Sequence, residues 1–90
     1  MKSVRTRQFN KLFDALPPDV QSAAREAYQL FQENRWNPVL HLEQVHGKRG
    51  LYWSARVQGL KYRALAIRHG PDTWLWFWIG SHAEYDKLLQ

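Results

Sequence analysis

The chain has 90 residues, 44% of them hydrophobic, with five tryptophans and a formal net charge of +5. This length gives one domain, residues 1–90, and the apolar content argues against a disordered chain. The absence of cysteine excludes disulfides and cysteine-ligated zinc, so packing alone must stabilise the core.

The first third of the chain predicts a helical hairpin. Phe9, Leu12, Phe13 and Leu16 recur at helical spacing. A Pro-Pro pair at 17–18 ends this helix and opens a second one, because proline disfavours helix before it and is tolerated in a first turn. The second helix is expected to end near residue 34 and to bury the apolar residues Val20, Ala23, Ala24, Ala27, Leu30 and Phe31.

After residue 38 the hydrophobic period changes to two, which predicts strands over residues 39–45, 51–57, 61–68 and 73–79. A further strand within residues 3–7 is left open. The last segment, residues 81–89, regains helical spacing, with Ser81 as N-cap and Glu84 completing a capping box. The sequence thus predicts an α+β fold: an N-terminal helical hairpin packed on a three- to four-stranded antiparallel sheet, followed by a short C-terminal helix.

The last predicted strand is apolar on both sides, with Trp74, Trp76 and Trp78 on one and Leu75, Phe77 and Ile79 on the other. This pattern is typical of a central strand covered on both faces. Packing is therefore the expected role of these tryptophans, in preference to base stacking.

Basic residues are segregated along the chain. Residues 44–71 contain six Lys or Arg side chains and no acid. Such a positive face suits phosphates or an acidic protein, although lysines that protect a sheet edge from aggregation are the alternative. No continuous apolar segment follows the charged start, as a secretory signal would require, so we expect a cytoplasmic protein with no membrane partner.

Three ordered motifs together resemble the RelE/ParE superfamily of toxins from bacterial type II toxin–antitoxin systems. They are FNKLFDALPPDVQSAAREA, LEQVHGKRGLYWSARVQGLKYRALAI and WFWIGSHAEYDKLL, and the similarity that runs from the first of them to the last covers nearly the whole chain. The resemblance implies a toxin held inactive by a cognate acidic antitoxin. Some members are mRNA interferases that cut messenger RNA on the ribosome, whereas the ParE branch inhibits DNA gyrase. A degenerate homologue that only binds antitoxin is a third possibility.

The resemblance also implies site residues. Arg63, in the YR pair, matches the position that contacts the scissile phosphate, and Arg56 lies near a basic residue of the preceding strand. His82 in GSHAEY matches a catalytic histidine of one branch, and Tyr85 falls close to a terminal tyrosine of other members. The chain departs from the RelE type where a lysine pair is expected, because Trp53 and Ala55 occupy that strand.

These residues fit a metal-independent endoribonuclease with no cofactor, in which the RNA 2′-hydroxyl attacks the adjacent phosphorus. Arginine offers fixed bidentate contacts to the phosphate, and histidine is suited to proton transfer near neutral pH. His46 is expected to act as a second proton carrier or backbone contact. The expected RNA-binding set is His46, Lys48, Arg49 and Lys61. Structural alternatives are a helix first-turn role for His82 and a cross-strand ion pair for Arg56.

Overall fold

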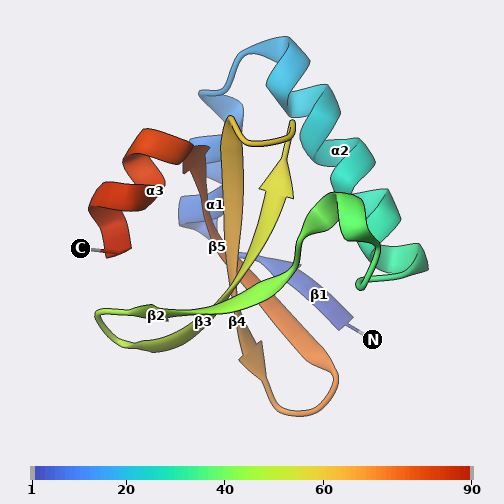
Figure 1. The fold of residues 1–90 in the computed structure, drawn as a ribbon, viewed down its shortest axis with the longest axis vertical. Helices are drawn as coiled ribbons and strands as arrows, with labels where there is room; N and C mark the ends of the chain where they lie inside the picture. Colours follow the sequence, from blue (N-terminus) through green and yellow to red (C-terminus); the bar gives the residue numbers. More distant parts are fainter. Residues whose placement is uncertain (1, 90) are drawn as a thin grey trace.

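The computed structural model describes residues 2–89, which form three α-helices, one 3-10 helix and a single five-stranded sheet (Figure 1). The elements, in chain order, are β1 Lys2–Arg5, α1 Arg7–Asp14, α2 Pro18–Glu33, η1 Pro38–Leu40, β2 Glu43–Gly47, β3 Gly50–Val57, β4 Tyr62–His69, β5 Thr73–Ser81 and α3 His82–Leu89. The strand order is β1-β5-β4-β3-β2. The α+β class is confirmed. The sheet is mixed and has five strands, so the expectation of three or four antiparallel strands is wrong in this respect.

The additional strand is β1, which pairs in parallel with β5, from Lys2 opposite Thr73 to Arg5 opposite Trp76. A side-chain hydrogen bond supports this pairing, because the Trp76 indole Nε1 donates to Ser3 Oγ at 2.9 Å. The N-terminal strand that the sequence left open is thus present. Because β1 lies beside it, β5 is an interior strand, as predicted.

The two N-terminal helices form the predicted pair on one face of the sheet. Thr6 caps α1 by accepting a hydrogen bond from the Phe9 amide at 3.1 Å, which satisfies a donor with no partner inside the helix. The Gln21 side-chain amide donates to the Phe13 carbonyl oxygen at 3.0 Å and links α2 to the end of α1. We call the sheet surface under these helices the α1/α2 face, and the opposite surface the α3 face.

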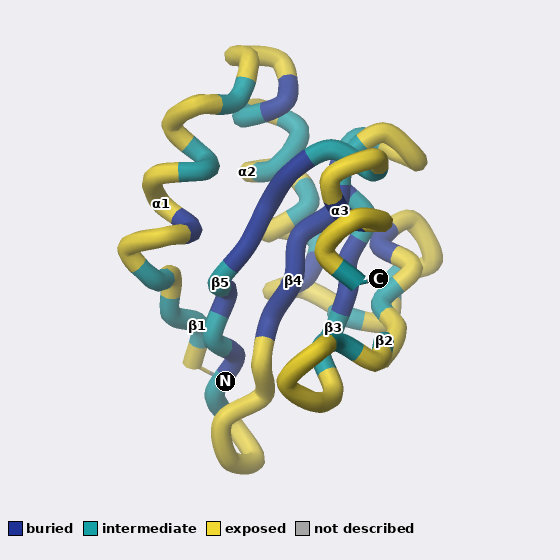
Figure 2. The backbone as a smooth tube through the Cα atoms, turned by 90° about the vertical axis from the view of Figure 1, so that its left-hand side faces the viewer, coloured by how far each residue is buried: buried dark blue, intermediate teal, exposed yellow. Residues whose placement is uncertain are grey.

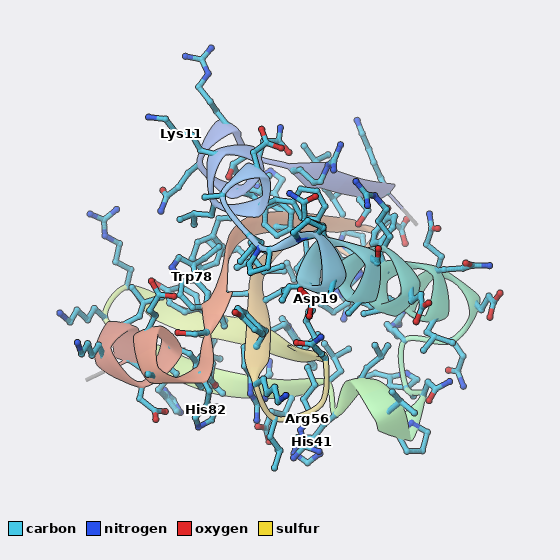
Figure 3. All side chains as sticks on the ribbon, turned by 90° about the horizontal axis from the view of Figure 1, so that it is seen from above. Lys11, Asp19, His41, Arg56, Trp78 and His82 are labelled. Carbon is cyan, nitrogen blue, oxygen red and sulfur yellow. The ribbon has the colours of Figure 1, made fainter. Side chains whose placement is uncertain are left out.

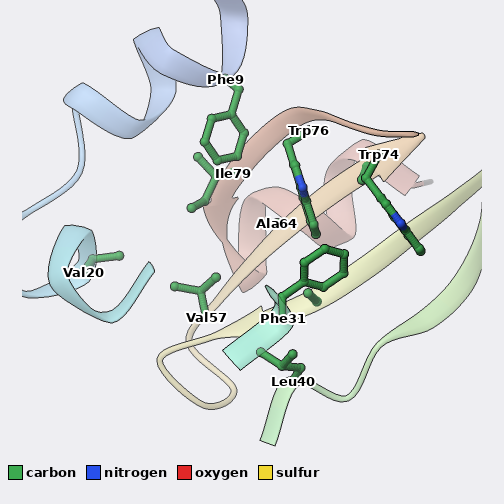
Figure 4. Packing of buried hydrophobic residues seen from close by; sticks show 11 residues of the cluster. Phe9, Val20, Phe31, Leu40, Val57, Ala64, Trp74, Trp76 and Ile79 are labelled. Carbon is green, nitrogen blue, oxygen red and sulfur yellow. The ribbon is translucent and has the colours of Figure 1, made fainter. Parts of the chain in front are cut away.

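The main core fills the space between the helix pair and the sheet (Figure 4). The Phe31 ring of α2 packs edge-on against Trp74 and Trp76, with 5.2 Å between ring centroids in each case. An edge-on contact between two aromatic rings is favourable in addition to the hydrophobic gain from burying them. Figure 2 shows that the buried backbone is concentrated in β3, β4 and β5, with exposed segments in the helices and turns.

A β-bulge in β5 divides its tryptophans between the two faces. Leu65 is opposite Trp78 and Ala66 is opposite Trp76, which leaves Phe77 as an extra residue. Trp74 and Trp76 therefore belong to the main core, whereas Trp78 packs on the α3 face with Leu65. The prediction that all three tryptophans share a face is wrong for Trp78, and Ile79 correspondingly joins the main core.

The strand expected over residues 39–45 begins later than predicted. Asn37 caps a short helical turn, η1, by accepting a hydrogen bond from the Val39 amide at 3.0 Å, and Leu40 is buried beneath it. His41 then adopts a left-handed backbone with φ of 44° before β2 starts at Glu43. Within residues 2–89, no helix has the length and apolar character needed to span a membrane.

Candidate functional site

The α3 face brings together the four residues expected to be catalytic. Arg56 of β3 and Arg63 of β4 are directly opposite each other, and Arg63 is opposite Gly80 near the end of β5. Because paired residues of neighbouring strands point to the same side of a sheet, both arginines lie on the side that carries α3. In Figure 3, His82 and Arg56 lie on the side of the ribbon away from Lys11 of α1. We call Arg56, Arg63, His82 and Tyr85 the α3-face cluster.

Arg63 is the most deeply held member of the cluster, with only 6% of its surface exposed. Its Nη1 donates to the Ser54 hydroxyl at 3.1 Å and lies 3.7 Å from a Glu43 carboxylate oxygen. The guanidinium carbon lies 5.2 Å from the centroid of the Tyr85 ring. Three neighbours thus fix its position, as a buried cation requires, while its Nε has no hydrogen-bond partner in the part of the chain that the structure describes.

Arg56 is half-buried and faces a like charge across the strands. Among residues 2–89 it has no carboxylate partner, so the expected alternative of a cross-strand ion pair is not present. Its Nε is buried without a hydrogen-bond partner. Like charges directly opposite in a sheet are destabilising. An anion bound beside the two guanidinium groups would relieve that repulsion.

His82 is held by the N-terminus of α3. Its backbone N–H donates to the Lys61 carbonyl oxygen at 2.8 Å. The predicted capping box is confirmed just before it, because the Glu84 amide donates to Ser81 Oγ at 3.2 Å and the Ser81 amide donates to Glu84 Oε1 at 3.1 Å. The imidazole Nε2 is 3.4 Å from an Asp86 carboxylate oxygen, and 44% of the side chain is exposed. His82 is therefore oriented by Asp86 and its ring is partly exposed, while its Nδ1 is buried without a hydrogen-bond partner among residues 2–89.

Tyr85 joins the histidine to the buried arginine. Its ring centroid is 5.8 Å from that of His82, and the Arg63 guanidinium lies over the same ring. Tyr85 is itself buried and also packs against Trp78. This position supports an orienting role for Tyr85 and does not support stacking of its ring on a substrate base.

The expected RNA-binding residues do not form one surface. His46 is opposite Leu51, which places it on the α1/α2 face, so it cannot act as a second proton carrier beside His82. Lys48 and Arg49 form the tip of the β2–β3 hairpin. Lys61 lies beyond the other end of β3, roughly 25 Å away along the strand. Of the four, only Lys61 adjoins His82.

Three polar residues of this site were not anticipated from the sequence. Ser54 is 0% exposed and accepts a hydrogen bond from Arg63. The Glu43 carboxylate lies near Arg63 and is 3.3 Å from the Nε2 atom of His41. Asp86 pairs with His82. The only signal was positional: Ser54 shares the alternation of Arg56, and Asp86 follows His82 by four residues in a helix. Among residues 2–89, no three His, Asp or Glu side chains are grouped so that they could hold a metal ion.

Comparisons of the chain with protein-family models, curated proteins and solved structures find no match. The residues of the α3-face cluster and their geometry are therefore the basis for assigning a function.

Proposed function

We propose that this protein is the toxin of a toxin–antitoxin pair and acts as a metal-independent endoribonuclease on messenger RNA at the ribosome. The observation that carries the proposal is the pair of directly opposed arginines, Arg56 and Arg63, on the face that also presents His82. Cations that contact the phosphate and a nearby proton-transfer group are the parts that cleavage by a neighbouring hydroxyl needs.

In the proposed reaction the 2′-hydroxyl attacks the adjacent phosphorus and the bond from phosphorus to the 5′-oxygen breaks, leaving a cyclic phosphate. Arg56 contacts the phosphate oxygens as negative charge develops on them. Arg63, buried next to Arg56, adds a fixed positive charge. His82 carries one of the two protons, with Asp86 orienting its ring. Since His46 lies on the other face, the second proton is exchanged with water.

The fold elements agree with the resemblance to RelE/ParE toxins: a helix pair precedes the β2–β5 meander, and a short helix follows it. The strand positions at which the RelE type carries its lysine pair are also explained by the fold. Trp53 and Ala55 point into or beside the main core on the α1/α2 face, so side chains at these two positions do not face the α3-face cluster. A lysine-based mechanism is therefore replaced in the proposal by one centred on His82.

The proposed regulator is a cognate acidic antitoxin in the same cytoplasm. The acid-free stretch from residue 44 to residue 71 forms β3, β4 and most of β2, which provides a basic sheet for an acidic segment that folds as it binds.

The test is a cell-free translation reaction with purified protein, followed by mapping of messenger RNA ends. New ends that require ribosomes are expected, and they should disappear with His82→Ala and Arg56→Ala. Arg7→Ala is the matched control, because Arg7 is an exposed arginine on α1. Cleavage that persists in His82→Ala, or intact RNA with the unmodified protein, would contradict the proposal.

A second function, inhibition of DNA gyrase without cleavage, is favoured by one observation. Arg63 is nearly fully buried and already contacts Ser54 and Glu43, which limits its direct contact with a phosphate. A supercoiling assay distinguishes the two. Inhibition of gyrase that is unaffected by His82→Ala would favour this ParE-type activity, and absence of both activities would leave an antitoxin-binding homologue.

A further inference from the structure

A row of aromatic rings extends from the core to the surface on the α1/α2 face. Trp36, just after α2, has its ring centroid 6.0 Å from that of Trp53 on β3, and Trp53 lies 5.3 Å from Trp74 on β5. Arg35 and Arg68 flank the row. We call these five residues the Trp36 platform. Trp74 is fully buried, whereas Trp36 is 56% exposed, so the row opens to solvent at Trp36.

Both arginines of the platform stack on indole rings. The Arg35 guanidinium carbon is 5.5 Å from the centroid of Trp36 and 5.8 Å from that of Trp74, and the Arg68 carbon is 5.1 Å from that of Trp74. Stacking of this kind holds a guanidinium flat while leaving N–H groups at its edge.

The charges of these arginines are not neutralised within the described part of the chain. Neither Arg35 nor Arg68 forms an ion pair there, although Glu33 and Asp72 are close in sequence. Among residues 2–89, Arg35 Nε is buried without a hydrogen-bond partner, and Arg68 donates to the Pro71 carbonyl oxygen at 2.9 Å. The platform therefore combines a half-exposed indole ring, which has the Arg35 guanidinium over it, with two cations that have no ion-pair partner among residues 2–89.

The basic β2–β3 hairpin continues this surface. His46 and Leu51 are opposite each other on the α1/α2 face, and Leu51 precedes Trp53 by two residues on the same side of β3. Lys48 and Arg49 form the hairpin tip beyond them. Of the residues expected to bind RNA, His46 is thus on the platform side of the sheet, and Lys48 and Arg49 lie at the tip of the same hairpin.

We propose that the Trp36 platform binds single-stranded RNA, with a base stacked on Trp36 and phosphates contacted by Arg35 and Arg68. Exposed aromatic rings interleaved with cations are the chemistry by which proteins hold unpaired nucleotides, because every base has a flat π face. An acidic peptide would match the charges but has no flat group for the open Trp36 ring. The platform lies on the sheet face opposite His82, so it is a second RNA contact, separate from the proposed site of cleavage.

The test is binding of a fluorescein-labelled, fully 2′-O-methylated adenosine 12-mer, measured by fluorescence anisotropy. This RNA lacks the attacking hydroxyl, so binding is measured independently of cleavage. Trp36→Ala should weaken binding about five-fold or more, and Trp36→Phe should restore most of it because the ring is kept. Leu60→Ala, which removes another exposed apolar side chain from the β3–β4 turn, should leave binding unchanged.

Salt dependence separates stacking from charge. Arg35→Gln should lower the slope of log K against log salt by about 0.7, the value for one phosphate contact on a single strand. Trp36→Ala should leave the slope unaltered, and Arg7→Gln is the matched control for loss of a surface arginine. Near-ultraviolet circular dichroism checks that each variant folds.

The proposal is overturned if Trp36→Ala binds the 12-mer as tightly as the unmodified protein, or if Leu60→Ala weakens binding equally. It is also overturned if the platform variants lose only the binding of an acidic peptide, for example a labelled Glu-rich 12-mer. Tight, Trp36-dependent binding by a protein that cleaves no RNA would support the platform and refute only the proposed nuclease.

Discussion

The hydrogen bond between Arg63 and Ser54 offers a direct test of how the α3-face cluster is held. We expect the two residues to be energetically coupled in a double-mutant cycle of Ser54→Ala, Arg63→Met and the double variant. The Arg63 Nη1 to Ser54 Oγ distance is 3.1 Å and Ser54 is fully buried, so water cannot replace a lost partner.

The structure sets the expected size of each change. Ser54→Ala leaves the guanidinium with Glu43 at 3.7 Å, and that half-exposed carboxylate compensates little. Loss of a hydrogen bond to a charged group then lowers the free energy of unfolding by about 2 kcal/mol. Arg63→Met leaves the Ser54 hydroxyl unpaired and removes the contact with Tyr85, which costs a similar amount. The double variant leaves neither polar group unpaired, so its loss should be about 1–2 kcal/mol smaller than the sum.

Urea denaturation followed by tryptophan fluorescence measures these values, with equal m-values required for the comparison. In thermal unfolding, a loss of 2 kcal/mol should lower the Tm by about 8–16 °C for a domain of this size. The control is Arg56→Met, which removes the opposing arginine that has no carboxylate partner; it should cost little and be additive with Ser54→Ala. Additivity of the Ser54 and Arg63 variants to within about 0.5 kcal/mol would mean that the two side chains are not coupled.

Three further predictions concern the end of β5, the start of α3 and the proposed complex. Gly80→Ala should lower the free energy of unfolding by about 1–3 kcal/mol, because the new Cβ would lie 2.7 Å from the Trp78 ring; an unchanged urea midpoint would contradict this. Glu84→Ala should cost about 1 kcal/mol and speed hydrogen exchange in the first turn of α3, whereas Glu26→Ala, at an exposed site on α2, should do neither. A complex with the acidic antitoxin should persist at salt concentrations that release RNA, because buried apolar contacts are insensitive to screening; earlier release of the antitoxin in a salt titration would argue against that binding mode.

The features that the sequence predicted well are those determined by neighbouring residues. The Pro17–Pro18 pair separates the two N-terminal helices because proline acts on its own turn. The Ser81–Glu84 capping box formed because its two hydrogen bonds join residues three apart. The faces of β3 and β4 also followed the predicted period of two, and Arg56 and Arg63, which the resemblance had grouped, lie opposite each other.

The features that were missed depend on partners distant in the chain. The β5 bulge sends Trp78 to the α3 face, and nothing in an unbroken apolar run marks the residue at which alternation changes. The face of His46 depends on its register with β3, which a short strand leaves weakly specified. Glu43 lies at the start of a strand whose beginning was placed too early, so its approach to Arg63 was hidden.

The parallel pairing of β1 with β5 also affects how the chain folds during synthesis. The partners of Lys2–Arg5 are Thr73–Trp76. After β1 is synthesised, about 70 further residues must be added before it can pair, which takes roughly 4–14 s at ordinary rates of translation. Contacts this distant in sequence slow folding, because a long loop must close before they form. While the chain is still on its own ribosome, β1 is a strand without a neighbour. The complete sheet, with the faces that carry Arg56 and Trp36, is assembled only after β5 has been synthesised.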